Sequence, residues 1–339
     1  MHSVCPGGAT PRGCRFVGLD VGTTNARAWL VTGGRIVTSR RAAIGIRDAA
    51  AAGSPEVLYD PLRRLISEVR AAGEGERGAP PSAVVAAGMI TSGLGLAEVP
   101  HSEAPAAIED LVRGAVCLRD QQVTELPLFL IPGVRSGADR LPPERIAEAD
   151  VMRGEETLCL GLLERGLLAP AGTVVNLGSH WKTISIDASG RIAGSTTTLT
   201  GELLHVAQTR TVLAGSVPDG RPGRLDPAWV EAGAAEAARS SLERALFCVR
   251  LLEQRSAGTA EQRLSFLVGC FLGGAIEGWL RIVPPGGEVV VTGGGAIGEY
   301  TARRLREAGR RARHLTGDGV DAAMVAGLHV LASFLLAGP

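Results

Sequence analysis

The chain predicts an α/β fold built from two related domains, and two observations support this prediction. The first is that apolar runs of strand length alternate with longer amphipathic segments along most of the 339 residues. The second is an internal repeat, because residues 17–36 can be laid on residues 173–192 at one fixed offset without a gap. In each copy an apolar run leads to an acid or amide, a glycine, a small hydroxyl residue and a second alternating run. A β-hairpin therefore occurs twice, as expected of a duplicated domain.

The first half of the chain continues from its hairpin with alternating strands and helices. We expect strands over 40–43, 83–87 and 127–132, and a helix over 55–72 with one apolar face. Two prolines and mixed charge predict a loop over 139–148. Asp150 is expected to cap a helix that runs through Leu163 and joins the two halves.

The second half repeats the hairpin and then becomes more helical. A proline-rich segment at 218–227 precedes two or three helices between 228 and 281, and a strand over 289–292 runs into a glycine-rich turn and a helix. The apolar run 322–337 contains His329 and is expected to be too short to cross a bilayer, so we predict a buried helix there.

Composition narrows the class of partner. The formal net charge is zero and the isoelectric point is near 7, which argues against a nucleic acid or an anionic membrane as partner. Six scattered cysteines without a CxxC pair fit reduced thiols in a cytoplasmic protein. Residues 1–14 lack the apolar core of a signal peptide and are expected to form a loose tail. Small soluble ligands remain.

Lys182 is the one lysine in the chain. Lysines and arginines together number 35, and the other 34 are arginines. Lys182 stands in the run Gly-Ser-His-Trp-Lys-Thr, within the second copy of the repeat. An ammonium on a flexible stem can follow a phosphoryl group in a way that a rigid guanidinium fork cannot. A leftover surface residue is the alternative, and the surrounding repeat argues against it.

The repeated hairpins have the composition of a phosphate site. Gly22, Thr23 and Thr24 in the first copy, and Gly178 and Ser179 in the second, offer backbone N–H groups and hydroxyls to phosphate oxygens. Asp20, just before the first turn, can hold a magnesium ion directly or through water. Two such hairpins facing each other would grip one polyphosphate, although Asp20 can also simply end a strand and cap a turn.

Two glycine motifs have competing interpretations. Gly293, Gly295 and Gly298 match a dinucleotide fingerprint between a strand and a helix, but too few residues follow for a complete dinucleotide domain. We expect instead that Gly293, Gly294 and Gly295 let the backbone approach an adenosine at a helix N-terminus. The run at 178–183 resembles a P-loop only superficially, because Trp181 replaces the required glycine.

Five segments together resemble the 2-dehydro-3-deoxygalactonokinase family of the sugar kinase, actin and Hsp70-like superfamily. The resemblance spans about Val17 to Leu335 and rests on Leu19–Trp29, Met152–Thr157, Gly178–Lys182, Leu199–Leu203 and the terminal helix from Gly317. It implies two ribonuclease-H-like domains, over 15–168 and 169–339, with ATP in the cleft between them and the last helix returning to the first domain. It also implies transfer of the γ-phosphoryl group of ATP to the 6-hydroxyl of 2-dehydro-3-deoxy-D-galactonate. One departure is that Trp181 precedes Lys182, where the family places a tryptophan after the lysine.

Within this family Asp20, Glu155 and Lys182 are the expected catalytic residues, with Mg²⁺ at Asp20. Phosphoryl transfer needs aligned charges and one carboxylate near the acceptor hydroxyl. Glu155 is our expected general base, and Asp20 or Asp150 is the alternative, because an aspartate is the usual base in the superfamily.

The expected substrate contacts are polar or charged. A 2-oxo acid brings a carboxylate that a guanidinium binds well, so the expected contacts are Arg27, Arg153, Glu156 and His180. Some of the expected site residues also have a purely structural interpretation. Glu155 and Glu156 are acids of the kind that stabilise a helix N-terminus. Arg27 can be a solvent-exposed strand residue, and His180 can have a structural position. Expected partners are ATP and a small sugar acid, with a homodimer left open. A phosphohydrolase and a nucleotide-dependent switch protein of the same superfamily are the alternative functions.

Overall fold

The computed structural model describes residues 14–73 and 79–337, so the expected tail over 1–14 lies, apart from Cys14, outside the described residues. The chain forms two compact units. Unit 1 comprises Met1–Ala171, Ser185–Ser195 and Asp318–Pro339, and unit 2 comprises Gly172–Ile184 and Thr196–Gly317. The expected division into 15–168 and 169–339 is continuous, whereas unit 1 also contains the segments 185–195 and 318–339 from the second half of the chain.

Unit 1 contains a six-stranded sheet of order β3-β2-β1-β4-β7-β6. The strands are β1 (Arg15–Val21), β2 (Ala26–Thr32), β3 (Arg35–Ala42), β4 (Val84–Gly88), β6 (Val116–Leu118) and β7 (Leu128–Leu130). The first three strands form the antiparallel hairpin predicted from the sequence, extended by β3, which begins earlier than the expected strand over 40–43. β4 pairs parallel to β1, with Val21 opposite Gly88, so the carboxyl ends of these strands meet at one edge.

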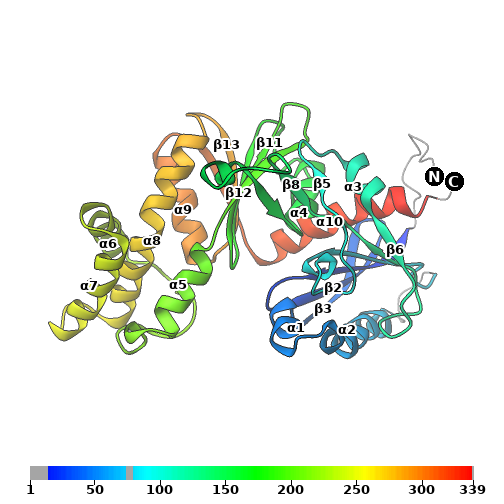
Figure 1. The fold of residues 1–339 in the computed structure, drawn as a ribbon, viewed down its shortest axis with the longest axis horizontal. Helices are drawn as coiled ribbons and strands as arrows, with labels where there is room; N and C mark the ends of the chain where they lie inside the picture. Colours follow the sequence, from blue (N-terminus) through cyan, green and yellow to red (C-terminus); the bar gives the residue numbers. More distant parts are fainter. Residues whose placement is uncertain (1–13, 74–78, 338–339) are drawn as a thin grey trace. The chain divides into compact units, whose positions relative to one another are not determined.

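Helices and a small sheet complete unit 1 (Figure 1). The helices are α1 (Ile46–Ala52), α2 (Tyr59–Ala72), α3 (Ile108–Gly114), α4 (Glu155–Glu164) and α10 (Gly317–Leu335), with 3-10 turns η1 (Pro55–Leu58), η2 (Met89–Thr91) and η3 (Pro143–Glu148). The three short strands β5 (Ser102–Glu103), β8 (Val134–Ser136) and β9 (Asp150–Met152) form the second sheet. As its periodicity predicts, α2 buries Leu62, Leu65, Ile66 and Val69 against the sheet.

The last helix packs closely into unit 1 through small residues. A Cβ at Gly161 of α4 would lie 1.7 Å from the carbonyl oxygen of Ala323, and one at Gly327 of α10 would lie 1.9 Å from that of Thr157. The two helices therefore touch backbone to backbone, which only glycine permits. α10 also lies over β1, where the ring of His329 stacks on Phe16 at 6.3 Å.

Unit 2 contains a five-stranded sheet of order β12-β11-β10-β13-β14. The strands are β10 (Thr173–Leu177), β11 (Trp181–Ile186), β12 (Ile192–Thr198), β13 (Glu288–Gly293) and β14 (Arg311–Leu315). β10, β13 and β14 are parallel neighbours, as β1, β4 and β7 are in unit 1. The repeated hairpins thus occupy equivalent places in two sheets of matching strand order, which is compatible with duplication.

The helices of unit 2 form a separate layer. They are α5 (Thr200–Thr209), α6 (Pro227–Arg239), α7 (Leu242–Gln254), α8 (Ala260–Ile282) and α9 (Ala296–Glu307), with a 3-10 turn η4 (Val212–Gly215). α6, α7 and α8 lie side by side (Figure 1), and they are the three helices expected between 228 and 281. Side chains of Asp226, Ser241 and Thr259 cap their N-termini.

Two sequence expectations about local structure were wrong. Asp150 does not cap a helix, because it lies in β9 opposite Ser136, and α4 begins at Glu155 after Gly154, whose φ is 105°. The C-terminal run forms the expected helix with a buried face, α10, but it is not too short for a membrane, because the helix over Gly317–Leu336, like α8, is long and apolar enough by length and composition. Half of the apolar window of each is buried inside the protein, and core helices of soluble proteins meet the same criteria.

Candidate active site

Asp20 lies at the carboxyl end of β1 in a cradle of glycines. It is 8% exposed. A Cβ at Gly88, which ends the neighbouring strand β4 with a φ of 91°, would lie 2.9 Å from Oδ1 of Asp20. A Cβ at Gly154, just before α4, would lie 3.7 Å from the same oxygen and 3.2 Å from Cα of Gly88. The sequence therefore keeps side chains away from one oxygen of this carboxylate.

Arg27, near the start of β2, neutralises the other oxygen. Its Nε and Nη2 donate to Oδ2 of Asp20 at 3.1 and 2.5 Å, and its Nη1 donates to Oδ1 of Asp321 at 2.8 Å. Burial alone would lower the pKa of Arg27, but the charges and hydrogen bonds of Asp20 and Asp321 outweigh burial and raise it. Arg27 is therefore a fixed cation between two carboxylates.

The hairpin turn of unit 1 is held by the segment that follows β3. The Gly22 N–H donates to Asn25 O at 2.8 Å and closes the turn, and the backbone N–H groups of Ile46 and Arg47 donate to the carbonyls of Gly22 and Thr23. Thr24 accepts a hydrogen bond from the Asn25 side chain. The three predicted phosphate-site residues Gly22, Thr23 and Thr24 thus share one short turn next to Asp20.

Glu155 and Glu156 open α4 but lie in different environments. Glu155 is half-buried, whereas Glu156 is fully buried and both its oxygens lie 2.8 Å from the backbone nitrogen of Gly154, which donates to them. Burial first, and the charge of Glu155 second, raise the pKa of Glu156 to about 8 against opposition from these hydrogen bonds and Arg153. In this conformation Glu156 caps its own helix, which speaks against direct contact with a substrate.

Arg153 ties the segment before α4 to the loop after β4. Its Nη1 donates to Oγ1 of Thr91 at 2.8 Å, and its Nη2 donates to the carbonyl of Val99 at 2.9 Å and approaches Nδ1 of His101 at 3.4 Å. Burial, together with the charges of Arg153 and Arg135, lowers the pKa of His101 to about 4. His101 is therefore neutral at neutral pH, and Nδ1 can accept from Arg153.

In unit 2 two glycine-rich turns meet at the carboxyl ends of parallel strands. β10 ends opposite β13, with Leu177 paired to Gly293, so the turn from Gly178 and the turn from Gly293 are neighbours. Gly293, Gly294 and Gly295 have φ values of 73°, 73° and 52°, in the left-handed region that favours glycine. Gly295 then caps α9. The three glycines thus lead the backbone from a buried strand into a helix N-terminus.

Strand alternation separates Trp181 from Lys182. Trp181 is 4% exposed and packs in the core against Trp279, with ring centroids 6.0 Å apart. Lys182, the next residue, points to the opposite face of β11 and is 6% exposed. Its Nζ donates to Oγ1 of Thr197 on β12 at 2.9 Å. The departure from the family pattern thus places this tryptophan in the core.

Ser179 and His180 lie in the turn between β10 and β11. Nε2 of His180 lies 3.2 Å from Oε2 of Glu202 on α5, and both side chains are partly exposed. A Cβ at Gly201 would lie 2.4 Å from the carbonyl oxygen of Gly178, so α5 begins directly on this turn. Glu202 is therefore next to the predicted phosphate-site residues of unit 2.

The donors around Asp20 fit a magnesium ion held partly by a ligand. Among residues 14–73 and 79–337 no three histidine, cysteine or acidic side chains cluster as a metal site. Magnesium often uses only one or two carboxylates, with substrate phosphates and water supplying the rest. Oδ1 of Asp20, in its glycine cradle, meets that requirement.

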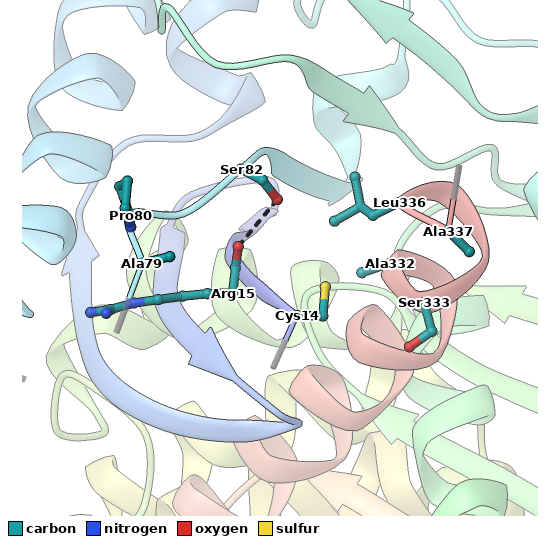
Figure 2. A pocket seen from close by; sticks show the side chains of 9 residues that line it. All are labelled: Cys14, Arg15, Ala79, Pro80, Ser82, Ala332, Ser333, Leu336 and Ala337. Carbon is teal, nitrogen blue, oxygen red and sulfur yellow. Dashed lines mark hydrogen bonds between the residues drawn. The ribbon is translucent and has the colours of Figure 1, made fainter. Parts of the chain in front are cut away.

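The structure also contains a cavity away from these residues. It lies in unit 1 (Figure 2), and apart from Arg15 its lining side chains are small or apolar. Its volume is about 260 Å³. Its lining residues are Cys14, Arg15, Ala79, Pro80, Ser82, Ala332, Ser333, Leu336 and Ala337. None of the predicted site residues is among them, so the cavity adds nothing to the candidate site.

Three residues next to the site were not predicted from sequence. Asp321 of α10 holds Arg27, Thr197 holds Lys182, and Nε2 of His314 donates to the carbonyl of Gly293 at 2.8 Å. Asp321 alone left a signal in the sequence, because it is an acid at the start of an apolar helix. The other two partners depend on strand pairing that the sequence does not reveal.

Comparison with known proteins identifies the family of this chain. The model of the 2-keto-3-deoxy-galactonokinase family matches residues 20–331. A 2-dehydro-3-deoxygalactonokinase of Escherichia coli K12 is 26% identical over 327 residues, covering 94% of this chain and 97% of the relative. A Rhizobium meliloti protein provisionally given the same name is 28% identical over 310 residues, covering 89% and 92%.

A solved structure extends the comparison to the fold. It is a Sinorhizobium meliloti protein, also provisionally named a 2-dehydro-3-deoxygalactonokinase, with a TM-score of 0.72 and 25% identity over 94% of this chain and 98% of its own. The likeness therefore holds along nearly the whole length of both chains. This chain belongs to the 2-keto-3-deoxy-galactonokinase family and is a phosphotransferase.

Proposed function

We propose that the protein transfers the γ-phosphoryl group of ATP to the 6-hydroxyl of 2-dehydro-3-deoxy-D-galactonate. One structural observation carries the proposal within this family of phosphotransferases. The β10 and β13 ends bring the Gly178 turn and three left-handed glycines together at a helix N-terminus. Backbone N–H groups in such a place bind anionic phosphate oxygens well.

The nucleotide is proposed to bind at unit 2. Gly293, Gly294 and Gly295 let the backbone approach the adenosine, and Gly178 and Ser179 hold phosphate oxygens. Lys182 supplies a cation to the transferred phosphoryl group, supported by its position on a strand that follows the Gly178 turn. Positioned cations matter here because phosphoryl transfer depends on charge neutralisation and alignment.

The acceptor hydroxyl is proposed to be deprotonated by a carboxylate of unit 1. Glu155, half-buried at the N-terminus of α4, is our candidate for the base that takes the proton of the 6-hydroxyl. Asp150, which accepts a hydrogen bond of 2.5 Å from Ser195, and Asp20, whose Oδ2 is bound by Arg27, are the alternative bases. Comparison of Glu155→Gln, Asp20→Asn and Asp150→Asn separates them. The base is the residue whose variant binds ATP normally and has lost transfer.

The substrate carboxylate is proposed to bind Arg153. Arg27 is the less suitable of the two predicted guanidiniums, because two carboxylates already neutralise it. Arg153 instead donates its hydrogen bonds to neutral acceptors on Thr91, Val99 and His101, so no carboxylate is hydrogen-bonded to it as Asp20 and Asp321 are to Arg27. His180 is proposed to donate to a phosphate or to the keto oxygen.

A magnesium ion is proposed to bind at Asp20 together with the phosphates, alongside Gly22, Thr23 and Thr24. When bound, the ion neutralises charge that develops on the transferred group. We also propose a cytoplasmic location, since ATP and the sugar acid are both soluble anions of metabolism.

The test is a product assay with the purified full-length protein. It is incubated with ATP, Mg²⁺ and a panel of 2-oxo-3-deoxy aldonates, and phosphorus NMR identifies the product. The expected product is a phosphomonoester on C6 of the galactonate compound. Free phosphate without sugar phosphate would indicate a phosphohydrolase, and ATP-dependent light scattering without turnover would indicate a switch protein. Either result overturns the proposal.

Lys182→Arg tests the role of the ammonium in the same assay. We expect kcat to fall by about tenfold or more with the fold retained, because a guanidinium cannot follow the phosphoryl group as a point charge does. Arg313→Lys, an exposed change on β14 of the same unit, is the matched control. Near-normal turnover of Lys182→Arg removes Lys182 from the site.

A further inference from the structure

Asp321 is a buried acid near the start of α10, and it has no part in the reaction as proposed. Asp321 is 6% exposed and its helix neighbours Ala323 and Met324 are buried apolar residues. A carboxylate in such surroundings loses the solvation that water would give, and it is retained only where cations compensate. Both its oxygens are in fact bound: Oδ1 by Arg27 at 2.8 Å and Oδ2 by Arg41 at 2.5 Å.

The two arginines around Asp321 differ in exposure. The side chain of Arg41, at the end of β3, is 60% exposed, whereas that of Arg27 is 25% exposed. Water screens the first ion pair far more than the second. The strong interaction of Asp321 is therefore the one with Arg27, which also binds Asp20.

The ion pair between Arg27 and Asp20 does not have the usual two-oxygen geometry. A guanidinium commonly places two parallel N–H groups on the two oxygens of a carboxylate. Here Nε and Nη2 of Arg27 both donate to Oδ2 of Asp20, at 3.1 and 2.5 Å. Oδ1 faces Gly88 and Gly154 instead. The third nitrogen of Arg27, Nη1, is held by Asp321, so the plane of the guanidinium is fixed from both ends.

We propose that Asp321 is a positioning residue for phosphoryl transfer: by holding Nη1 of Arg27 it keeps that guanidinium on Oδ2 of Asp20 and leaves Oδ1 for the ligand. Without the charge of Asp321, Arg27 shifts onto both oxygens of Asp20 and covers the one in the glycine cradle. The inference rests on the proposed function, in which Asp20 acts on the bound ligands.

The first test is kinetic and uses Asp321→Asn, which is nearly isosteric and removes the charge. We expect kcat to fall by about tenfold while KM for ATP stays within about twofold, because the lost contact acts on the transition state and not on nucleotide binding. Asp321→Glu keeps the charge and is expected to restore most of kcat. Equal losses in both variants would assign the effect to packing and overturn the proposal.

Two further variants separate positioning from general stability. Arg41→Ala removes the exposed partner of the same carboxylate and is expected to leave kcat within about twofold of normal. Arg27→Lys combined with Asp321→Asn is expected to lower kcat no more than Arg27→Lys alone, because Asp321 acts only through Arg27. Additive losses would show that Asp321 acts by another route and would overturn the proposal.

The last readout does not depend on activity. In NMR spectra the Nη1 hydrogens of Arg27, identified by their loss in Arg27→Lys, are expected to exchange slowly in the wild type and faster in Asp321→Asn, because Nη1 is the nitrogen that Asp321 binds. An unchanged signal would mean that Asp321 does not hold Arg27. If the signal responds but the wild type makes no sugar phosphate, the proposed function has failed and the positioning contact has not.

Discussion

Replacing Glu156 by glutamine is expected to change how the stability of the protein depends on pH. Glu156 is fully buried at the start of α4, and its pKa is raised from 4.5 to about 8 by burial first and by the charge of Glu155 second. In the unfolded chain the same group is in water and titrates near its ordinary value. The folded protein therefore keeps a proton on Glu156 over a pH range in which the unfolded chain releases it.

The direction and size of the effect follow from that difference. A raised folded-state pKa contributes stability that is complete below pH 4.5 and is lost as pH rises toward 8. Between about pH 5.5 and about pH 7.5 the loss in the free energy of unfolding is about 2 kcal/mol. Glutamine carries no ionisable proton, and its amide oxygen can still accept the hydrogen bond from the Gly154 N–H, so the variant lacks this loss.

Urea denaturation at the two pH values measures the effect. Relative to the wild type, Glu156→Gln is expected to gain about 2 kcal/mol on going from the lower to the higher pH. Burial lowers the pKa values of His101 and His329, but both histidines are present in the wild type and in the variant, so their contributions cancel in the difference. Glu109→Gln, an exposed acid in the first turn of α3, is the matched control and should run parallel to the wild type. If the free energy of unfolding of Glu156→Gln changed with pH as that of the wild type does, the reasoning would be refuted.

Three further substitutions test packing around the site. Gly298→Ala would place a Cβ 2.3 Å from the carbonyl oxygen of Gly293 and from Nε2 of His314, so we expect the turn to shift, with weaker ADP binding in calorimetry and a lower thermal midpoint; unchanged affinity would contradict a nucleotide role for that turn. Gly327→Ala would place a Cβ 1.9 Å from the carbonyl oxygen of Thr157 and should lower the thermal midpoint by separating α10 from α4; an unchanged midpoint would contradict this close packing. Leu62→Ala empties a fully buried position and should cost about 2–5 kcal/mol in urea denaturation, and a cost below about 1 kcal/mol would mean that α2 is not anchored there.

The parts of the fold that the sequence predicted are those governed by local periodicity. The alternation of apolar residues located both hairpins, and the 3.6-residue period located the buried face of α2. The same alternation explains why Trp181 packs in the apolar core whereas Lys182, although also buried, faces the other side of β11. Periodicity also places the carboxyl end of β1, and hence Asp20, at an edge where other strands end.

The failure at Asp150 shows where local rules stop. An acid followed by an apolar run predicts a helix N-cap. Asp150 instead lies in β9 and pairs with Ser136 of β8 in a short antiparallel ladder. The turn into α4 is then made by Gly154 at a φ of 105°, a conformation open to glycine but costly for aspartate. Pairing with a distant strand thus outweighed a local capping preference of about 1 kcal/mol.

The ion pair of Asp321 with Arg27 is a contact that the sequence implies but does not locate. An acid inside an apolar helix pattern implies a compensating cation, because an uncompensated buried carboxylate would destabilise the fold. The sequence therefore predicts that a partner exists, but with 34 arginines among the 35 lysines and arginines it gives no means of choosing one. The partner, Arg27, lies 294 positions away, and only the packing of α10 on β1 brings the two together. A buried charge is thus a reliable sign that a long-range contact is present, and the structure is needed to show that this contact ends at Asp20.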